Sequence, residues 1–156
     1  DQATENAVTN SIADGVSYAI AAGNDSGANA CNVSPAGTPN AITVGSTTNT
    51  DARSSFSNIG TCLDVFAPGS SITAAWNSSD SATNTISGTS MAAPHVAGGA
   101  ALYLQSEPAA SPAAVASAVF ANATPGVVTN PGNGSPNRLL YTAFVSIVKP
   151  PVSPAP

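Results

Sequence analysis

Three short apolar runs constrain the fold of this chain more than any other feature of its sequence. They occupy residues 17–22, 41–45 and 63–67. Turn-forming residues close two of them, beginning at Gly23 after the first run and at Pro68 after the third. Short runs without polar alternation are typical of strands that are covered on both faces. We therefore expect three buried strands joined by polar loops.

The sequence also predicts three helices. Apolar residues recur at every fourth position through residues 5–17, which is helical spacing. Residues 90–105 are apolar almost all round, so we expect a buried helix there. Proline is tolerated only in an early turn, so Pro94 places the start of that helix near Ser90. A serine–proline pair at 111–112 is typical of a helix start, with serine as N-cap and proline at the first position.

The remaining segments are less regular. Residues 70–87 are mostly polar, and we expect extended chain and a hairpin there. Residues 138–148 form a last apolar stretch, and residues 149–156 are rich in proline. Proline-rich segments of this kind are extended linkers. The chain begins with Asp1 rather than methionine, so we expect a processed or truncated product.

Composition excludes several classes of function. The net charge is −5, and only three residues are basic, so phosphate neutralisation cannot drive binding to nucleic acid. No apolar run reaches the roughly 18 residues of a membrane-spanning helix. The two cysteines, Cys31 and Cys62, allow one disulfide or two free thiols. The scarcity of lysine and glutamate favours an extracellular chain, in which the cysteines would be bridged.

Ser90 is the first candidate for chemistry. It follows Gly88-Thr89 at the start of the predicted helix, where unpaired backbone N–H groups and the helix dipole favour a developing negative charge. An oxyanion forming beside this hydroxyl would be stabilised there. A serine in this place is more often simply an N-cap, so the position alone does not assign a function.

A longer string around Ser90 resembles the nucleophile motif of the subtilisin-like serine proteases. It reads Gly88-Thr89-Ser90-Met91-Ala92-Ala93-Pro94-His95-Val96-Ala97-Gly98. Three further stretches, at residues 21–24, 53–58 and 64–69, resemble the same family in order and spacing. The resemblance extends from about residue 7 to residue 141 and is strongest to the proteinase K and aqualysin branch. It implies the C-terminal part of a doubly wound, mostly parallel α/β sheet with helices on both faces.

The resemblance implies a role for each matching residue. Ser90 would be the nucleophile of a serine endopeptidase, and Asn24 would donate its side-chain amide to the oxyanion. By itself, Asn24 reads as a turn residue. Polypeptide substrates would be bound in extended form. The residues implied in substrate binding are Ala22, Gly23, Val33, Ser34, Gly88 and Thr89.

The catalytic triad of the family is incomplete in this sequence. The mechanism requires a histidine base and an orienting aspartate, which in the family precede the segment that contains Asn24. The only histidine, His95, matches a buried structural position of the family and lies about 140° around the helix from Ser90. We therefore expect residues 1–148 to be a partial peptidase domain that is inactive alone. The alternative is a secreted, non-catalytic binding or structural module derived from a protease.

The resemblance also implies structural features outside the catalytic site. Cys31 and Cys62 match a disulfide of the aqualysin-like branch. Asp64 matches the side-chain ligand of a calcium site whose other protein ligands are the carbonyls of Pro39 and Ala41, a donor set that Ca²⁺ prefers. Otherwise Asp64 merely caps a strand. We expect no catalytic cofactor, no nucleic-acid or membrane partner, a secreted protein, and a monomer when complete.

Overall fold

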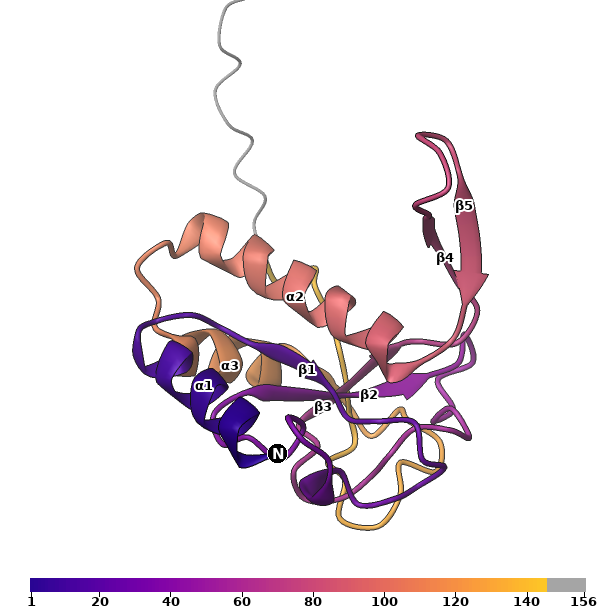
Figure 1. The fold of residues 1–156 in the computed structure, drawn as a ribbon, viewed down its shortest axis with the longest axis horizontal. Helices are drawn as coiled ribbons and strands as arrows, with labels where there is room; N and C mark the ends of the chain where they lie inside the picture. The colour runs from indigo at the N-terminus through magenta and orange to yellow at the C-terminus, as the bar shows by residue number, and fades with distance from the viewer. Residues whose placement is uncertain (146–156) are drawn as a thin grey trace, which may run out of the picture.

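The computed structural model describes residues 1–145, and a parallel sheet forms the centre of this part of the chain (Figure 1). Its strands, in spatial order, are β1 (Ala19–Ala21), β2 (Ile42–Thr47), β3 (Val65–Pro68), β7 (Arg138–Leu139) and β6 (Thr124–Pro125). The first four strands run parallel, and only β6 is antiparallel to its neighbour. The three predicted strands are therefore confirmed as β1, β2 and β3.

The parallel register brings three strand ends to one edge of the sheet. Ala21 pairs with Val44, and Val44 pairs in turn with Val65. The chain leaves β1 at Ala22 and leaves β3 close to Gly69, at the same edge. In open α/β sheets ligands bind outside the carboxyl ends of the strands. This edge is therefore where a site is expected.

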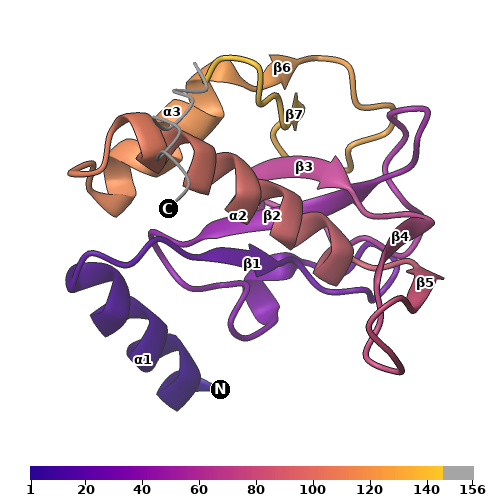
Figure 2. The same ribbon diagram turned by 90° about the horizontal axis from the view of Figure 1, so that it is seen from above.

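Helices cover both faces of the sheet, as the fold expectation required. Their bounds are α1 (Gln2–Ala13), α2 (Thr89–Ser106) and α3 (Pro112–Asn122), and α2 lies across β1, β2 and β3 in Figure 2. One apolar cluster joins Val8 of α1 to Phe66, while a second joins Val96 of α2 and Val119 of α3 to Val44. Two cores on opposite faces of one sheet define a doubly wound α/β arrangement.

Strand β2 shows how the sequence separates these two cores. Ile42 and Val44 pack under α2, whereas the side chain of Thr43 reaches the Ala36 carbonyl on the other side. Gly45 also faces that other side, where an added Cβ would lie 2.6 Å from Leu63 and from Phe66. Every residue of β2 is buried, because this strand lies between two parallel neighbours and two covered faces.

The helix at residues 90–105 differs from its prediction in burial. It begins at Thr89, within one residue of the expected start, but Pro94 lies in its second turn. Only one side of α2 is buried; that side comprises Thr89, Ala92, Ala93, Val96, Gly99 and Ala100. The opposite side, which includes His95, is exposed. The expectation of a helix buried all round is therefore wrong for the described chain.

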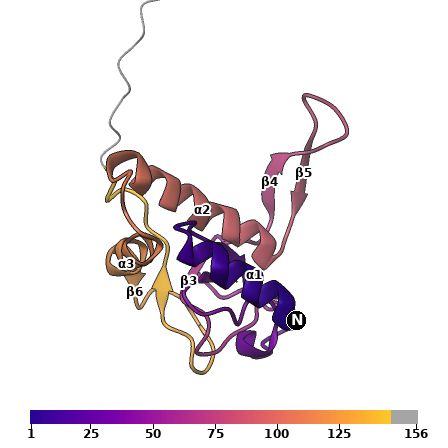
Figure 3. The same ribbon diagram turned by 60° about the vertical axis from the view of Figure 1, so that its left-hand side comes forward.

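The other predicted segments are found with shifted ends. Helix α1 begins at Gln2, because the Asp1 side chain accepts a hydrogen bond from the Ala3 amide, and it ends at Ala13. Ser111 caps α3 as predicted, accepting from the Ala114 amide. The expected hairpin is formed by β4 (Ile72–Ala75) and β5 (Thr83–Ile86), and it projects from the body of the molecule (Figure 3).

Part of the sequence prediction lies outside the described residues. The proline-rich segment 149–156 is not among them, nor is the end of the apolar stretch 138–148. Within the described part, none of the helices combines the length and apolarity needed to cross a membrane.

Candidate active site

The loop that follows β1 is joined to the start of α2 through Asn24. Its side-chain oxygen accepts hydrogen bonds from the Thr89 amide at 2.9 Å and from the Thr89 hydroxyl at 3.0 Å. These two bonds fix the oxygen side of the amide against the helix. The Asn24 nitrogen Nδ2 is therefore left as the donor that can serve a bound group.

The side-chain nitrogen of Asn24 and the backbone nitrogen of Ser90 both lie near Gly88. A Cβ added to Gly88 would lie 3.7 Å from Asn24 Nδ2 and 3.7 Å from Ser90 N. Ser90 is the second residue of α2, so its N–H has no intrahelical acceptor four residues back. Two N–H donors and the positive end of the α2 dipole therefore lie near Gly88.

Ser90 lies beside these donors and is exposed. Gly88 precedes the helix in extended conformation, and its amide donates to the Gly69 carbonyl at 2.8 Å. The start of α2 is thereby attached to the chain that leaves β3. The hydroxyl of Ser90 is accessible to a substrate, while the backbone beneath it is held by the sheet edge.

Thr89 is buried and links the start of α2 to the loop that follows β1. Its hydroxyl donates to Asn24 and accepts from the Gly23 amide at 3.2 Å. Thr89 and Gly88 are among the substrate-binding residues that the family resemblance implies. In the structure the Thr89 side chain holds the Gly23–Asn24 backbone, and a contact with substrate remains a prediction.

Asn58 is a residue of this site for which the sequence predicts no role. It is fully buried in the loop between β2 and β3, and its backbone amide donates to the Gly23 carbonyl at 3.0 Å. Its side chain binds Ala22 and Asp25 on either side of Asn24. No local pattern marks it, because its partners lie more than 30 positions earlier in the chain.

The remaining predicted substrate residues are only partly brought together. Ala22 and Gly23 continue β1 directly into the Asn24 loop, with Ala22 buried and its amide bonded to Val44. Val33 and Ser34 follow a short 3₁₀ helix, η1 (Ala30–Asn32). Among the described residues, neither of them is hydrogen-bonded to Ser90. Their place in a substrate pocket therefore stays a prediction.

His95 does not complete a catalytic pair with Ser90. Its Nδ1 donates to the Met91 carbonyl at 2.8 Å, one turn back along the same helix. The ring is exposed, so the expectation of a buried structural histidine is wrong for the described chain. The reason is the uncovered face of α2. Since His95 is the only histidine in the sequence, these residues do not supply a histidine base for Ser90.

The three predicted calcium ligands line one small cavity. Pro39, Ala41 and Asp64 surround a volume of about 260 Å³ beside Cys62. Oδ2 of Asp64 accepts from the Thr43 amide at 2.8 Å, and burial raises the pKa of this carboxyl above its ordinary value. A half-buried carboxylate beside a loop with carbonyl oxygens suits a hard cation. Within the described residues no cluster of three acidic, cysteine or histidine side chains exists, but a site built on carbonyls needs none.

The predicted disulfide is confirmed. Cys31 and Cys62 are bonded, with their Cα atoms 5.2 Å apart. The bridge joins η1 to the loop before β3, at the margin of the Asp64 cavity. It therefore ties together the two loops between which the calcium ligands are predicted.

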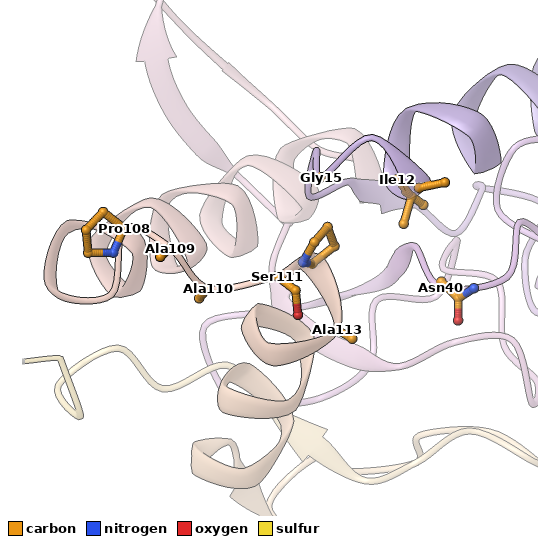
Figure 4. A pocket seen from close by; sticks show the side chains of 10 residues that line it. Ile12, Gly15, Asn40, Pro108, Ala109, Ala110, Ser111 and Ala113 are labelled. Carbon is orange, nitrogen blue, oxygen red and sulfur yellow. The ribbon is translucent and has the colours of Figure 1, made fainter.

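A larger cavity of about 580 Å³ lies away from Ser90, between the end of α1 and the loop that joins α2 to α3 (Figure 4). Its walls are formed by Ile12, Ala13, Gly15, Asn40 and residues 108–113. None of these side chains is charged, and the hydroxyl of Ser111 is used to cap α3. The reactive groups of the described chain are at the sheet edge instead.

The fold and the site together define an α/β protein with a candidate serine nucleophile at a helix start. A family model described as "Subtilase family" matches residues 1–140. The chain belongs to the subtilase family.

Known relatives agree with this assignment. An "Extracellular serine proteinase" of Thermus sp. (strain Rt41A) is 62% identical over 142 residues, covering 91% of this chain and 34% of that protein. "Alkaline serine exoprotease A" of Vibrio alginolyticus is 56% identical over 140 residues, covering 90% of this chain and 26% of that protein. The chain thus spans about a third of these relatives or less.

A solved structure shows the same fold. The chain resembles the "Crystal structure of a cold adapted subtilisin-like serine proteinase" with a TM-score of 0.87 and 50% identity. The match covers 91% of this chain and 50% of that one. The sequence resemblance to subtilisin-like proteases is therefore confirmed, together with the expected fold.

Proposed function

We propose that this chain provides the nucleophile and the oxyanion site of a secreted serine endopeptidase. The observation that supports the proposal most is the pair of hydrogen bonds from Thr89 to the oxygen of Asn24. These bonds occupy the oxygen of Asn24 and leave its nitrogen as a donor near Gly88, where the backbone nitrogen of Ser90 also lies. Such a donor pair has a direct use in acyl transfer, since it stabilises the negative charge of a tetrahedral intermediate.

The reaction proceeds through an acyl-enzyme. The hydroxyl of Ser90 attacks the scissile carbonyl and transfers its proton to a general base. The carbonyl oxygen becomes an oxyanion between Asn24 Nδ2 and the Ser90 amide. The intermediate collapses, the amine leaves with the proton from the base, and water then hydrolyses the ester at Ser90 by the same steps in reverse.

The base is a histidine that this chain does not supply, oriented by an aspartate that it does not supply either. The exposure of His95 and its bond to Met91 support this, because they remove the one histidine present from the reaction. By itself the chain should have at most trace activity. The alternative is a non-catalytic binding module, for which the donor pair beside Ser90 has no evident purpose.

Substrates are polypeptides bound in extended form along strand edges. The backbone of Ala22 and Gly23, together with Gly88 and Thr89, borders the reacting carbonyl. Val33 and Ser34 form the remaining wall of a pocket for an apolar side chain.

A structural Ca²⁺ is held by Asp64 and by the carbonyls of Pro39 and Ala41. The ion contributes stability to the two loops joined by the disulfide and takes no part in the chemistry. The relative named an extracellular proteinase and the disulfide both support secretion. The complete protein acts as a monomer, without nucleic-acid or membrane partners.

A labelling experiment separates the protease from the binding module. The chain is mixed with the complementary N-terminal half of a relative and treated with a fluorophosphonate probe, which reacts only with an activated serine. We expect labelling in the mixture, little in the chain alone, and none in the Ser90→Ala variant. Absence of labelling in a mixture that forms a stable complex contradicts the protease proposal.

A further inference from the structure

We propose that Asn58 is a positioning residue that holds Asn24 in its oxyanion-binding place. This inference rests on the proposed function for its catalytic consequence. Asn58 makes four hydrogen bonds to the segment 22–25, and none of them goes to Asn24 itself. The bonds act on the residues before and after Asn24, so they fix its backbone from both sides.

The four bonds use every polar group of Asn58 except its backbone carbonyl. Nδ2 donates to the Ala22 carbonyl at 3.1 Å and to the Asp25 carboxylate at 2.9 Å. Oδ1 accepts from the Asp25 amide at 2.8 Å, and the backbone amide donates to the Gly23 carbonyl. A side chain that is both donor and acceptor is required, which an amide satisfies and a carboxylate or an alkyl group does not.

Apart from the bonds of the Ala22 amide to Val44 and of the Gly23 amide to Thr89, the segment that Asn58 holds has few restraints of its own. Gly23 has a φ of +100°, a left-handed conformation that costs glycine little and gives the chain little resistance to other conformations. Asn24 and Asp25 are both exposed, so packing does not restrain them. Asn58 itself is 0% exposed and anchored in the loop between β2 and β3, so it transmits the rigidity of the core to an exposed loop.

Asn24 is therefore fixed by two independent contacts. Thr89 binds its side-chain oxygen from α2, and Asn58 holds its backbone from the β2–β3 loop. Rate acceleration by an oxyanion donor depends on its position, and a displacement of about 1 Å can cost on the order of 10²-fold. Loss of the Asn58 contacts should therefore lower the rate of the chemical step without removing any group that touches substrate.

The first test compares Asn58→Ala with Asn137→Ala in the active complex defined above. Asn137 is a matched control, since its side chain makes two hydrogen bonds to the backbone of Val128 in another part of the fold. We expect Asn58→Ala to lower kcat by about 10- to 100-fold with KM nearly unchanged. Asn137→Ala should lose comparable stability and keep its kcat. A kcat for Asn58→Ala within twofold of wild type overturns the proposal.

The second test exploits the carboxylate of Asp25. Asn58→Asp places two carboxylates side by side and should lower kcat at least as far as Asn58→Ala. Adding Asp25→Asn restores a donor opposite the new carboxylate and should recover part of the lost kcat, while Asp25→Asn alone has little effect. A double variant no more active than Asn58→Asp alone contradicts the proposed contact.

A third measurement does not depend on enzymatic activity. It therefore tests the positioning role of Asn58 separately from the proposed protease function. In the chain alone, the side-chain amide of Asn24 should give one pair of sharp NMR resonances, which broaden or divide in Asn58→Ala but not in Asn137→Ala. If the wild-type complex is never labelled at Ser90, the proposed function fails and this spectrum alone decides the positioning role. Unchanged Asn24 resonances in Asn58→Ala refute that role.

Discussion

The side-chain oxygen and nitrogen of Asn24 have different roles in the proposed site. Its oxygen accepts two hydrogen bonds from Thr89, and its nitrogen remains as a donor near Gly88. A carboxylate in its place would lack the donor and would repel an oxyanion. We therefore predict that the proposed oxyanion site depends on an amide side chain at this position.

Asn24→Asp in the active complex tests this directly. We expect kcat to fall by about 10²–10³-fold, a magnitude established for the loss of one such donor in subtilisin itself, with little change in KM. Asn133→Asp, another exposed asparagine that makes no contact with Ser90, serves as the control and should retain full kcat. An unchanged kcat in Asn24→Asp excludes the oxyanion role.

Asp64 provides a prediction that depends on pH. Desolvation by burial raises its pKa above the ordinary 3.8, although the Thr43 amide and Arg138 oppose the rise. The native state thus holds this proton more tightly than the unfolded chain. In the absence of calcium, the free energy of unfolding should fall as pH rises from the ordinary pKa through the raised one. Asp64→Asn should remove this fall, which chemical denaturation at several pH values would measure.

Bound calcium should oppose this loss of stability at higher pH, because the cation favours the ionised carboxylate of Asp64. At neutral pH the wild-type chain should gain unfolding free energy with rising Ca²⁺ concentration, as expected for a ligand that binds only the folded state. Asp64→Asn should gain none, and Mg²⁺ should stabilise the wild type less. Equal stabilisation of both proteins by Ca²⁺ contradicts the predicted site.

Helix α2 is the element on which the site depends most. Its first turn presents Ser90, its buried side packs on β1 to β3, and its start is bound to Gly69 at the sheet edge. Pro94 cannot donate to the carbonyl four residues earlier, which is that of Ser90. The position of the nucleophile is therefore set by packing and by the loops around it more than by the helix ladder.

Strand β2 allows a packing test with a matched control. Gly45→Ala should destabilise the chain by about 1–3 kcal/mol, since the new methyl group meets Leu63 and Phe66 at 2.6 Å. Gly98→Ala adds the same methyl group in α2, where nothing lies within 4 Å in the described chain. It should be neutral or stabilising by up to about 1 kcal/mol, because alanine favours the helix. Urea denaturation of both variants measures the difference.

At the scale of the whole molecule, the disulfide joins the loop that precedes β2 to the loop that follows it. Cys31 and Cys62 are 31 positions apart, so the bridge restricts the unfolded chain considerably. Replacing both cysteines by serine should lower the free energy of unfolding by about 3–4 kcal/mol. Urea denaturation of the variant without reductant measures this loss, and wild-type protein in dithiothreitol should approach it. A variant as stable as the oxidised wild type contradicts the prediction.

The strands and helices followed from local patterns, because apolar runs and helical spacing are properties of neighbouring residues. Their ends were less predictable: α1 begins three residues early, since the Asp1 side chain caps it. The burial of α2 was overestimated for a related reason. An apolar sequence shows that a helix can be covered, but the chain described here supplies elements for one side only.

Sequence alone determined the family, because the motif around Ser90 is long and specific. Through that resemblance it predicted the roles of Ser90 and Asn24 and the bridge between Cys31 and Cys62. Tertiary structure added the contacts that surround these residues. It alone showed that Asn58 holds the Asn24 loop and that Thr89 orients the Asn24 amide. Residues more than 30 positions apart meet through the pairing of parallel strands, and no local pattern in a single sequence specifies which side chains face one another there.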